Sequence, residues 1–273
     1  INKSLTIDGG EEKYTISAGT GFDMTTLWGT TPAGKYHVIN IKGGDVTLQN
    51  LTIDGGWDET VDADTSTGSC ARSGVNTWTG GTPGTVTLNN VTIENCSTYA
   101  VTVNSGFTVN ITDLTTSGNR YGVNVDANSK VTIGGEATDI TEDSSIVYEN
   151  NSTENGSLTV NDGTYQNIVV QVAGSDGTAT ETPGGTVTLN GGTYNGTSGT
   201  NGVVYSIGGT PTEIQNPNDA TNPLKGIVTV KGGTYPVDDN GDNALVEALI
   251  PEGGQLGTDG KIEPADDSVA SIN

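Results

Sequence analysis

The sequence is poor in apolar and in basic residues. Hydrophobic residues make up 32% of the 273 positions, only ten residues are lysine or arginine, and the net charge at pH 7 is −23. A globular domain of this length normally contains more leucine, isoleucine and phenylalanine. So few basic residues cannot neutralise a track of phosphates, which excludes a nucleic-acid partner and argues equally against an anionic membrane surface. No segment is long and apolar enough to span a bilayer, so membrane insertion is not expected.

Helical periodicity is nearly absent as well, and only ALVEALI at 244–250 shows it. Low hydrophobicity combined with high net charge is typical of disordered chains. The apolar residues, however, recur as V-T-L and V-T-V triplets, and alternation with a period of two predicts β-strands. We therefore expect an ordered, all-β protein.

One short phrase recurs along the chain. Residues 184–194 read GGTVTLNGGTY, and residues 226–235 read GIVTVKGGTY. Eight segments align with this phrase, and they begin at Leu5, Val46, Val86, Val109, Val131, Leu158, Val187 and Val228. Their starts are separated by 41, 40, 23, 22, 27, 29 and 41 residues, so a bare unit has about 22 residues and the excess is inserted loop. A second strand precedes most units, at 37–41, 73–77, 99–103, 121–125, 146–150, 168–172 and 202–207.

Three short strands in about 22 residues match one coil of a right-handed parallel β-helix, in which neighbouring coils bury each other's apolar residues. The residue between the second and third strands is always Asn, Asp or Gly: Asn50, Asn90, Asp113, Gly135, Asp162, Gly191 and Gly232. These types accept the left-handed backbone conformation that a sharp corner requires. We predict a right-handed parallel β-helix of about eight coils, as a single domain over 1–273. A capping coil at 1–36 precedes the coils at 37–243, and a C-terminal cap follows at 244–273.

Several stretches resemble a known family. They are KSLTIDGGEEKYTI, VINIKGGDVTLQNLTIDGG, the GGTY units, and GGTYPVDDNGD followed by IPEGGQLGTDGKIEP. They resemble the pectate-lyase-like β-helix domains of large surface proteins of gut Firmicutes, and the resemblance covers most of the chain. It implies a secreted, cell-wall-attached bacterial protein whose signal peptide and anchor lie outside these 273 residues. Members of the family are commonly described as adhesins or as proteins of unknown role, while proteins that share the fold cleave polysaccharides.

Residues for sugar-cleaving chemistry are scarce. Pectin hydrolases of this fold use clustered aspartates with a histidine and an Arg/Lys pair, and the lyases use acidic Ca²⁺ ligands with an arginine base. The one histidine here, His37, has no carboxylate pair near it in the sequence. We therefore predict no catalytic residue, although two carboxylates at glycosidase spacing could still meet across coils.

The two arginines precede equivalent strands, in CARSGV and GNRYGV, so Arg72 and Arg120 should lie two coils apart, roughly 10 Å, on one face. Such a pair suits a carboxylate or sulfate of a glycan, although each arginine could instead offset nearby acidic residues. Inserted loops of the same coil contain Trp57 and Trp78, which could stack on a sugar ring or pin the loops onto the rod. We predict a ligand-binding edge formed by Trp57, Arg72, Trp78 and Arg120.

The cysteines fall at equivalent positions of adjacent coils. The expected separation of Cys70 and Cys96 lies within disulfide range, and a secreted protein favours a bridge. We predict a disulfide between them, with a stacked pair of unoxidised thiols as the alternative.

Calcium is the only cofactor for which the sequence contains a candidate binding motif. Asp62, Asp64 and Ser66 have the alternate spacing of a Ca²⁺ loop, which Asp238, Asn240 and Asp242 echo, but neither continues to a terminal glutamate. A Ca²⁺ site at Asp62, Asp64 and Ser66 is therefore a candidate, and solvated acidic loops are the alternative.

These observations predict a non-catalytic, adhesin-like domain on a bacterial cell surface that binds host or dietary glycans or glycoproteins through loops on one edge. A polysaccharide lyase or glycoside hydrolase of the same fold is the alternative. A structural spacer, which would only project another domain from the cell wall, is a second alternative. The sequence contains no feature that indicates an oligomeric state.

Overall fold

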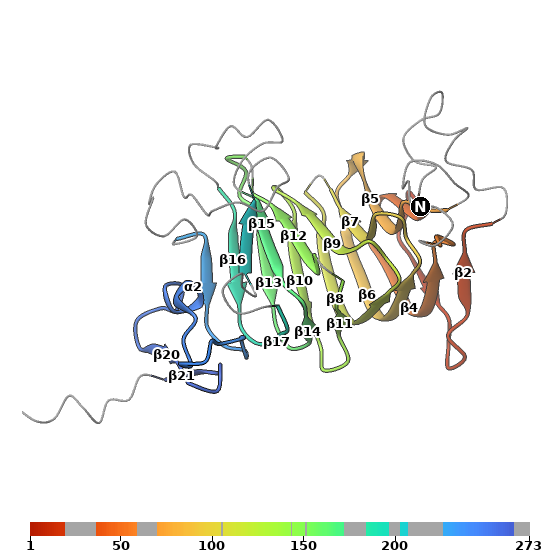
Figure 1. The fold of residues 1–273 in the computed structure, drawn as a ribbon. Helices are drawn as coiled ribbons and strands as arrows, with labels where there is room; N and C mark the ends of the chain where they lie inside the picture. The colour runs from red at the N-terminus through yellow and green to blue at the C-terminus, as the bar shows by residue number, and fades with distance from the viewer. Residues whose placement is uncertain are drawn as a thin grey trace, which may run out of the picture.

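The computed structural model describes residues 1–19, 37–58, 70–104, 106–142, 144–150, 152–171, 184–196, 203–206 and 226–264. Within these ranges the chain forms a right-handed parallel β-helix, as the repeats predict. Figure 1 shows the coils stacked side by side, from the N-terminal strands to the helix α2 (Ala244–Glu247) and the terminal hairpin.

Two parallel sheets form the walls of this helix. The first sheet contains, in spatial order, β1 (Leu5–Asp8), β4 (Val46–Asp54), β6 (Thr85–Glu94), β8 (Thr108–Ser117), β10 (Lys130–Gly134), β13 (Ser157–Val160), β16 (Thr186–Leu189) and β19 (Val228–Val230). Beside this path lie β2 (Thr15–Ser17), β11 (Asp139–Ile140), β14 (Thr164–Tyr165) and β17 (Thr193–Tyr194). The second sheet contains β3 (His37–Gly43), β5 (Ser73–Thr82), β7 (Tyr99–Val103), β9 (Tyr121–Asp126), β12 (Ile146–Glu149), β15 (Ile168–Gln171) and β18 (Val203–Ser206).

The register of the first sheet matches the sequence alignment residue by residue. The residues that begin the eight repeats pair in one continuous column: Leu5, Val46, Val86, Val109, Val131, Leu158, Val187 and Val228. A slip of one residue would turn every inward side chain outward, so the apolar alternation specifies this register strongly.

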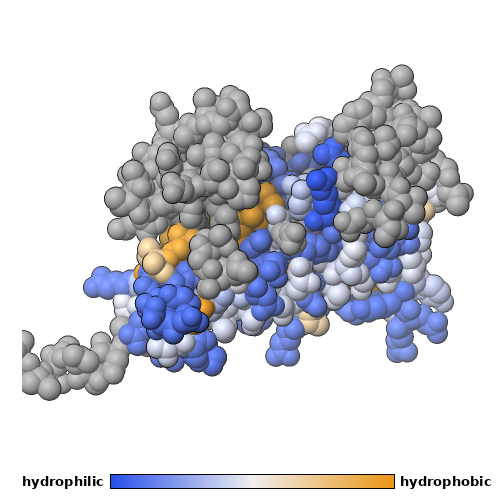
Figure 2. All heavy atoms as spheres, viewed as in Figure 1, coloured by the Kyte–Doolittle hydropathy of each residue, from blue (hydrophilic) through white to orange (hydrophobic). Residues whose placement is uncertain are grey.

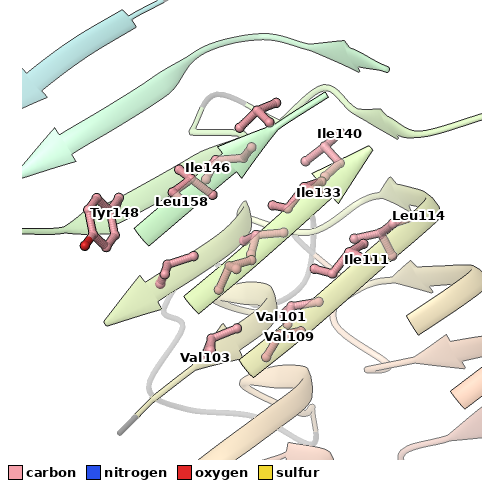
Figure 3. Close-up of a cluster of buried hydrophobic side chains, with 14 of the residues drawn as sticks. Val101, Val103, Val109, Ile111, Leu114, Ile133, Ile140, Ile146, Tyr148 and Leu158 are labelled. Atoms are coloured by element: carbon pink, nitrogen blue, oxygen red, sulfur yellow. The ribbon is translucent and has the colours of Figure 1, made fainter. Parts of the chain in front are cut away.

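The core lies between the two sheets. Columns of valine, leucine and isoleucine from the first sheet meet the column that runs from Ile39 through Val75 and Val101 in the second. Figure 3 shows this packing for side chains of both sheets, among them Val101, Val109 and Ile133. Each coil needs only a few such residues because the coils on either side bury them, which explains the low apolar content. On the face drawn in Figure 2, hydrophilic residues cover most of the described surface.

The bend within each coil of the first sheet uses a residue with positive φ. The prediction is confirmed for Asn50, Asn90, Asp113 and Gly135, whose φ angles are 52°, 53°, 54° and 110°. It is wrong by one residue in the last three coils, where the positive φ belongs to Gly163, Gly192 and Gly233 instead of Asp162, Gly191 and Gly232.

A buried tyrosine explains this shift. In the last three coils Tyr165, Tyr194 and Tyr235 point into the core and stack at ring-centroid distances of 5.5 and 4.6 Å. A Cβ on Gly192 would lie 2.8 Å from the Tyr165 ring, so the second glycine of the unit passes directly against the aromatic column. Only glycine fits a bend at that position.

The C-terminal end of the rod is covered by a small cap. The helix α2 begins after Asn243, whose side chain accepts a hydrogen bond from the Val246 backbone, and Val246 and Leu249 pack onto the core. The helix spans only the first four residues of the 244–250 segment that shows helical periodicity. The antiparallel strands β20 (Gly254–Leu256) and β21 (Ile262–Pro264) follow it. In the described part of the chain, no helix has the length and apolar character needed to cross a membrane.

We expect the inward columns to carry most of the stability. Ile111→Ala removes a side chain that is 1% exposed, so it should lower the free energy of unfolding by about 2–5 kcal/mol. Asn110→Ala, on the exposed face of the same strand, should change it by about 0.5 kcal/mol or less. Urea denaturation of both variants checks this, and equal losses would contradict the assigned register.

Candidate ligand-binding surface

The two arginines lie at equivalent positions two coils apart, in agreement with the repeat register. The Arg72 carbonyl accepts a hydrogen bond from the Thr98 backbone, and the Thr98 carbonyl accepts one from the Tyr121 backbone, next to Arg120. Arg72 and Arg120 therefore precede β5 and β9, with β7 between these strands. Both arginines are exposed.

Tyrosines follow the arginine positions. Tyr99 and Tyr121 pair in register at the starts of β7 and β9, and their ring centroids are 5.3 Å apart. Their neighbours Ala100 and Gly122 face the core: Ala100 is fully buried, and a Cβ on Gly122 would lie 2.5 Å from Ile140. The two tyrosines thus point outward, and the Arg120 guanidinium lies 5.2 Å from the centre of the Tyr121 ring. This is the geometry of a cation–π contact.

A half-buried carboxylate, Glu149, extends the same surface toward the next coil, and a buried amide, Asn124, supports it. Asn124 Nδ2 donates a 2.8 Å hydrogen bond to Glu149 Oε1, and Glu149 pairs in register with Asp126. Burial raises the pKa of Glu149 above its usual value, and the nearby Asp126 carboxylate adds to this, while the hydrogen bond from Asn124 opposes it. Burial also raises the pKa of Tyr99 to about 12, with a further contribution from Glu149.

We name this cluster the Arg–Tyr–Glu surface and define it as Arg72, Tyr99, Arg120, Tyr121, Asn124 and Glu149. It combines aromatic rings, two guanidinium groups, an amide and a carboxylate on neighbouring coils of the second sheet. Sequence reasoning found only the arginines. The tyrosines directly follow the aligned arginine positions in CSTYAV and GNRYGV and could have been found there, whereas no sequence signal pairs Asn124 with Glu149.

The structure does not bring the two predicted tryptophans to this surface. Trp57 is buried, with 9% of its side chain exposed, and its backbone N–H donates to the Asn95 carbonyl of the next coil. It is therefore not an exposed stacking platform, and that expectation was wrong. Trp78 is half-buried and lies five residues beyond Ser73 on β5, roughly 16 Å from the arginine end of the strand. Lys42 Nζ lies 5.1 Å from the centre of its ring.

His37 lies half-buried at the start of β3, in register with Ser73. Burial and the neighbouring Arg72 charge lower its pKa to about 4, so it is neutral at pH 7. It adds no cationic charge to the Arg–Tyr–Glu surface.

Of the two acidic motifs, only the second lies within the described residues. Asp62, Asp64 and Ser66 lie outside the described residues. In the second motif, Asp238 Oδ1 accepts hydrogen bonds from the backbone of Asn240 and of Asp242, at 2.8 and 3.0 Å. That carboxylate therefore closes its own turn, an arrangement typical of an Asx-turn.

The predicted disulfide is absent from this structure. Cys70 and Cys96 lie in adjacent coils and are both buried, but they are not bridged. Cys96 Sγ packs against Gly55 and donates a hydrogen bond to the Glu94 carbonyl. Burial raises the pKa of Cys96 far above its usual value, and the Asp54 carboxylate adds to this effect. The structure thus contains the alternative, a stacked pair of thiols.

The site and fold together define a right-handed parallel β-helix with a mixed aromatic and charged surface on one sheet. Comparisons with protein-family models, with curated proteins and with solved structures found no match for this chain.

Glu149 should make folding stability depend on pH. Because its pKa is raised on folding, it contributes stability that is complete below its usual pKa of 4.5 and is lost as the pH rises through the folded-state value. Glu149→Gln keeps an acceptor for Asn124 and removes this loss. It should therefore be more stable than the wild type near pH 7 and lose that advantage near pH 4. The measurement is urea denaturation at both pH values.

The control for this experiment is Glu154→Gln, which removes the same charge at an exposed position. It should show no pH-dependent advantage beyond the general effect of lowering the net negative charge. An equal advantage for both variants would contradict the assigned environment of Glu149.

The thiols should be unreactive in the folded protein. A thiol-specific reagent needs the thiolate, which burial disfavours, so neither cysteine should react quickly under native conditions. Both should react after denaturation without reductant. A denatured protein with no reactive thiol would show that the bridge forms instead.

Proposed function

We propose that this chain is a non-catalytic, adhesin-like domain of a bacterial cell-surface protein, and that it binds acidic glycans or glycoproteins, of host or dietary origin, through the Arg–Tyr–Glu surface. The observation that carries this proposal is the pair of outward tyrosines, 5.3 Å apart, flanked by the two arginines.

The chemistry of these side chains suits a sugar chain. Aromatic rings offer a flat apolar face with a polar rim, and sugar rings present C–H faces of complementary shape. Glu149 supplies a hydrogen-bonding group beside the rings, as binding sites with a few placed polar groups do, and the buried Asn124 donates to it. Their mutual hydrogen bond holds both side chains in position before a ligand arrives.

The arginines favour an anionic group on that glycan. The protein carries a net charge of −23, so an acidic ligand is repelled by most of its surface. Arg72 and Arg120 are its only arginines, and a guanidinium binds carboxylate or sulfate with two parallel hydrogen bonds. A uronic acid, a sialic acid or a sulfated sugar fits this arrangement best.

Glycan cleavage is the second candidate function, and one observation favours it. Glu149 and Asp126 are paired across adjacent strands, which lie about 4.8 Å apart, and the raised pKa of Glu149 suits a general acid. Retaining glycosidases hold two carboxyl groups about 5 Å apart. In that case Glu149 would protonate the leaving oxygen as the glycosidic bond breaks, Asp126 would bond to the anomeric carbon, and water deprotonated by Glu149 would then release the sugar.

The cell-surface location is supported by the resemblance of the repeats to Firmicutes surface domains and by the acidic, Thr- and Asn-rich composition. Both features also suit a spacer. The spacer differs from the adhesin in that it needs no outward aromatic pair.

A glycan array containing uronic-acid, sialylated, sulfated and neutral glycans tests the proposal, with product analysis on every glycan. Acidic glycans should bind, and Arg120→Gln should weaken their binding about tenfold or more, because charge-assisted bonds contribute about 1.5–3 kcal/mol. Tyr121→Ala should also weaken the binding of acidic glycans, because it removes one ring of the outward pair. Lys130→Gln removes an equal charge from an exposed position on the first sheet and should leave the affinity within about twofold.

The other outcomes separate the alternatives. If the wild type releases shortened glycan and a folded Glu149→Gln variant does not, the protein is a glycan-cleaving enzyme and the adhesin proposal is wrong. If no glycan of the array binds, the proposal is wrong and a structural spacer is the remaining function. Equal weakening by Arg120→Gln and Lys130→Gln would locate any binding elsewhere.

A further inference from the structure

A long open groove lies along the bends of the first sheet, in the last coils of the β-helix. It has a volume of about 660 Å³ and crosses successive coils from Glu136 to Lys261. We call it the corner groove and define it by Glu136, Asp162, Thr164, Asn190, Thr193 and Thr234. It is separate from the Arg–Tyr–Glu surface, because its residues border the bends of the first sheet.

Glycines keep this groove open, and the tyrosine column makes its floor rigid. A Cβ on Gly191 would lie 2.9 Å from Asp162 Oδ1, so a larger residue there would fill the groove. Beneath it, the hydroxyls of Tyr165, Tyr194 and Tyr235 donate to the carbonyls of Asp162, Gly191 and Gly232, at 2.9, 3.1 and 3.0 Å. The floor is therefore held from within the core, which lowers the ordering cost of binding.

A straight line of hydroxyl groups follows the groove. Thr164 pairs in register with Thr193, and Thr193 with Thr234, so the hydroxyls repeat at the coil spacing of about 4.8 Å. Among the described residues, none of these three hydroxyls has a hydrogen-bond partner. Asn190 uses its amide N–H₂ on Asn161, which leaves its carbonyl oxygen available.

The charges around the groove disfavour the binding of an anionic ligand. Glu136 and Asp162 are exposed carboxylates at one end. At the other end Lys261 is already paired with Asp259, at 2.7 Å. A chain carrying carboxylate or sulfate groups would therefore meet uncompensated negative charge, whereas a neutral chain would not.

We infer that the corner groove is a second binding site, which takes a linear, neutral polysaccharide laid along the axis of the β-helix. Successive sugar hydroxyls bond to the threonine hydroxyls and to Asn190, at a repeat comparable with the length of one sugar residue. This site does not depend on the acidic-glycan site, and the two differ in the charge of the ligand they select.

Calorimetric titration with neutral β-linked gluco-, xylo- and manno-oligosaccharides of increasing length tests the inference. Affinity should rise with chain length until the groove is filled and then level off. Thr193→Trp fills the groove from an exposed position and should weaken the binding of the longest chain about tenfold or more. Thr186→Trp places the same residue at another exposed position of the same coil and should change it by about twofold or less.

Thermal denaturation of both tryptophan variants verifies that each is folded. No binding of any neutral oligosaccharide by the wild type would overturn the inference, as would equal effects of the two variants. Loss of acidic-glycan binding in Arg120→Gln would leave the neutral site intact, so the two sites fail or succeed separately.

Discussion

Parallel pairing between consecutive coils is the interaction on which this structure depends. Except at the two ends of each sheet, the strands of the described coils bond to the equivalent strands one coil earlier and one coil later, so the apolar residues of one coil are covered by those of its neighbours. The protein therefore needs few hydrophobic residues and tolerates a large negative charge on its outer faces. The same pairing aligns outward residues, so that equivalent positions of separate coils become neighbours on the surface.

The corner groove depends on how the bend within a coil of the first sheet is made, and the structure contains two forms of this bend. In the coils of β4, β6 and β8 an asparagine or aspartate takes the left-handed conformation, and Asn90 Nδ2 donates a hydrogen bond to Asn50 Oδ1 across the coils. Aliphatic residues such as Leu51 and Ile53 follow the bend in the core. In the last three coils a glycine takes the bend, at Gly163, Gly192 and Gly233, and a tyrosine follows two residues later in the core. Glycines of these bends line the corner groove.

Electrostatics distinguishes the two surfaces for which we propose ligands. Around the corner groove the described carboxylates Glu136 and Asp162 are exposed and would repel an anionic ligand. On the second sheet, Arg72 and Arg120 provide a cationic position beside Tyr99 and Tyr121. Since the rest of the chain is strongly acidic, the placement of two arginines two coils apart decides where an anion can approach.

The sequence by itself determined the fold, the number of coils and the register. A period-two pattern allows only one inward set of residues, and this pattern occurs in each of the eight repeats. It also placed Arg72 and Arg120 at equivalent positions of two different coils. Only the tertiary structure decided that Trp57 is buried, that Trp78 lies far along β5 from the arginines, and that Glu149 meets Asn124. These features depend on the direction of a side chain after a bend and on which coil covers it. No local pattern in the sequence predicts either property. The one-residue shift of the bend to Gly163, Gly192 and Gly233 has the same origin, because the space that a side chain would need is occupied by Tyr165 at the first two positions and by the backbone of the preceding coil at the third.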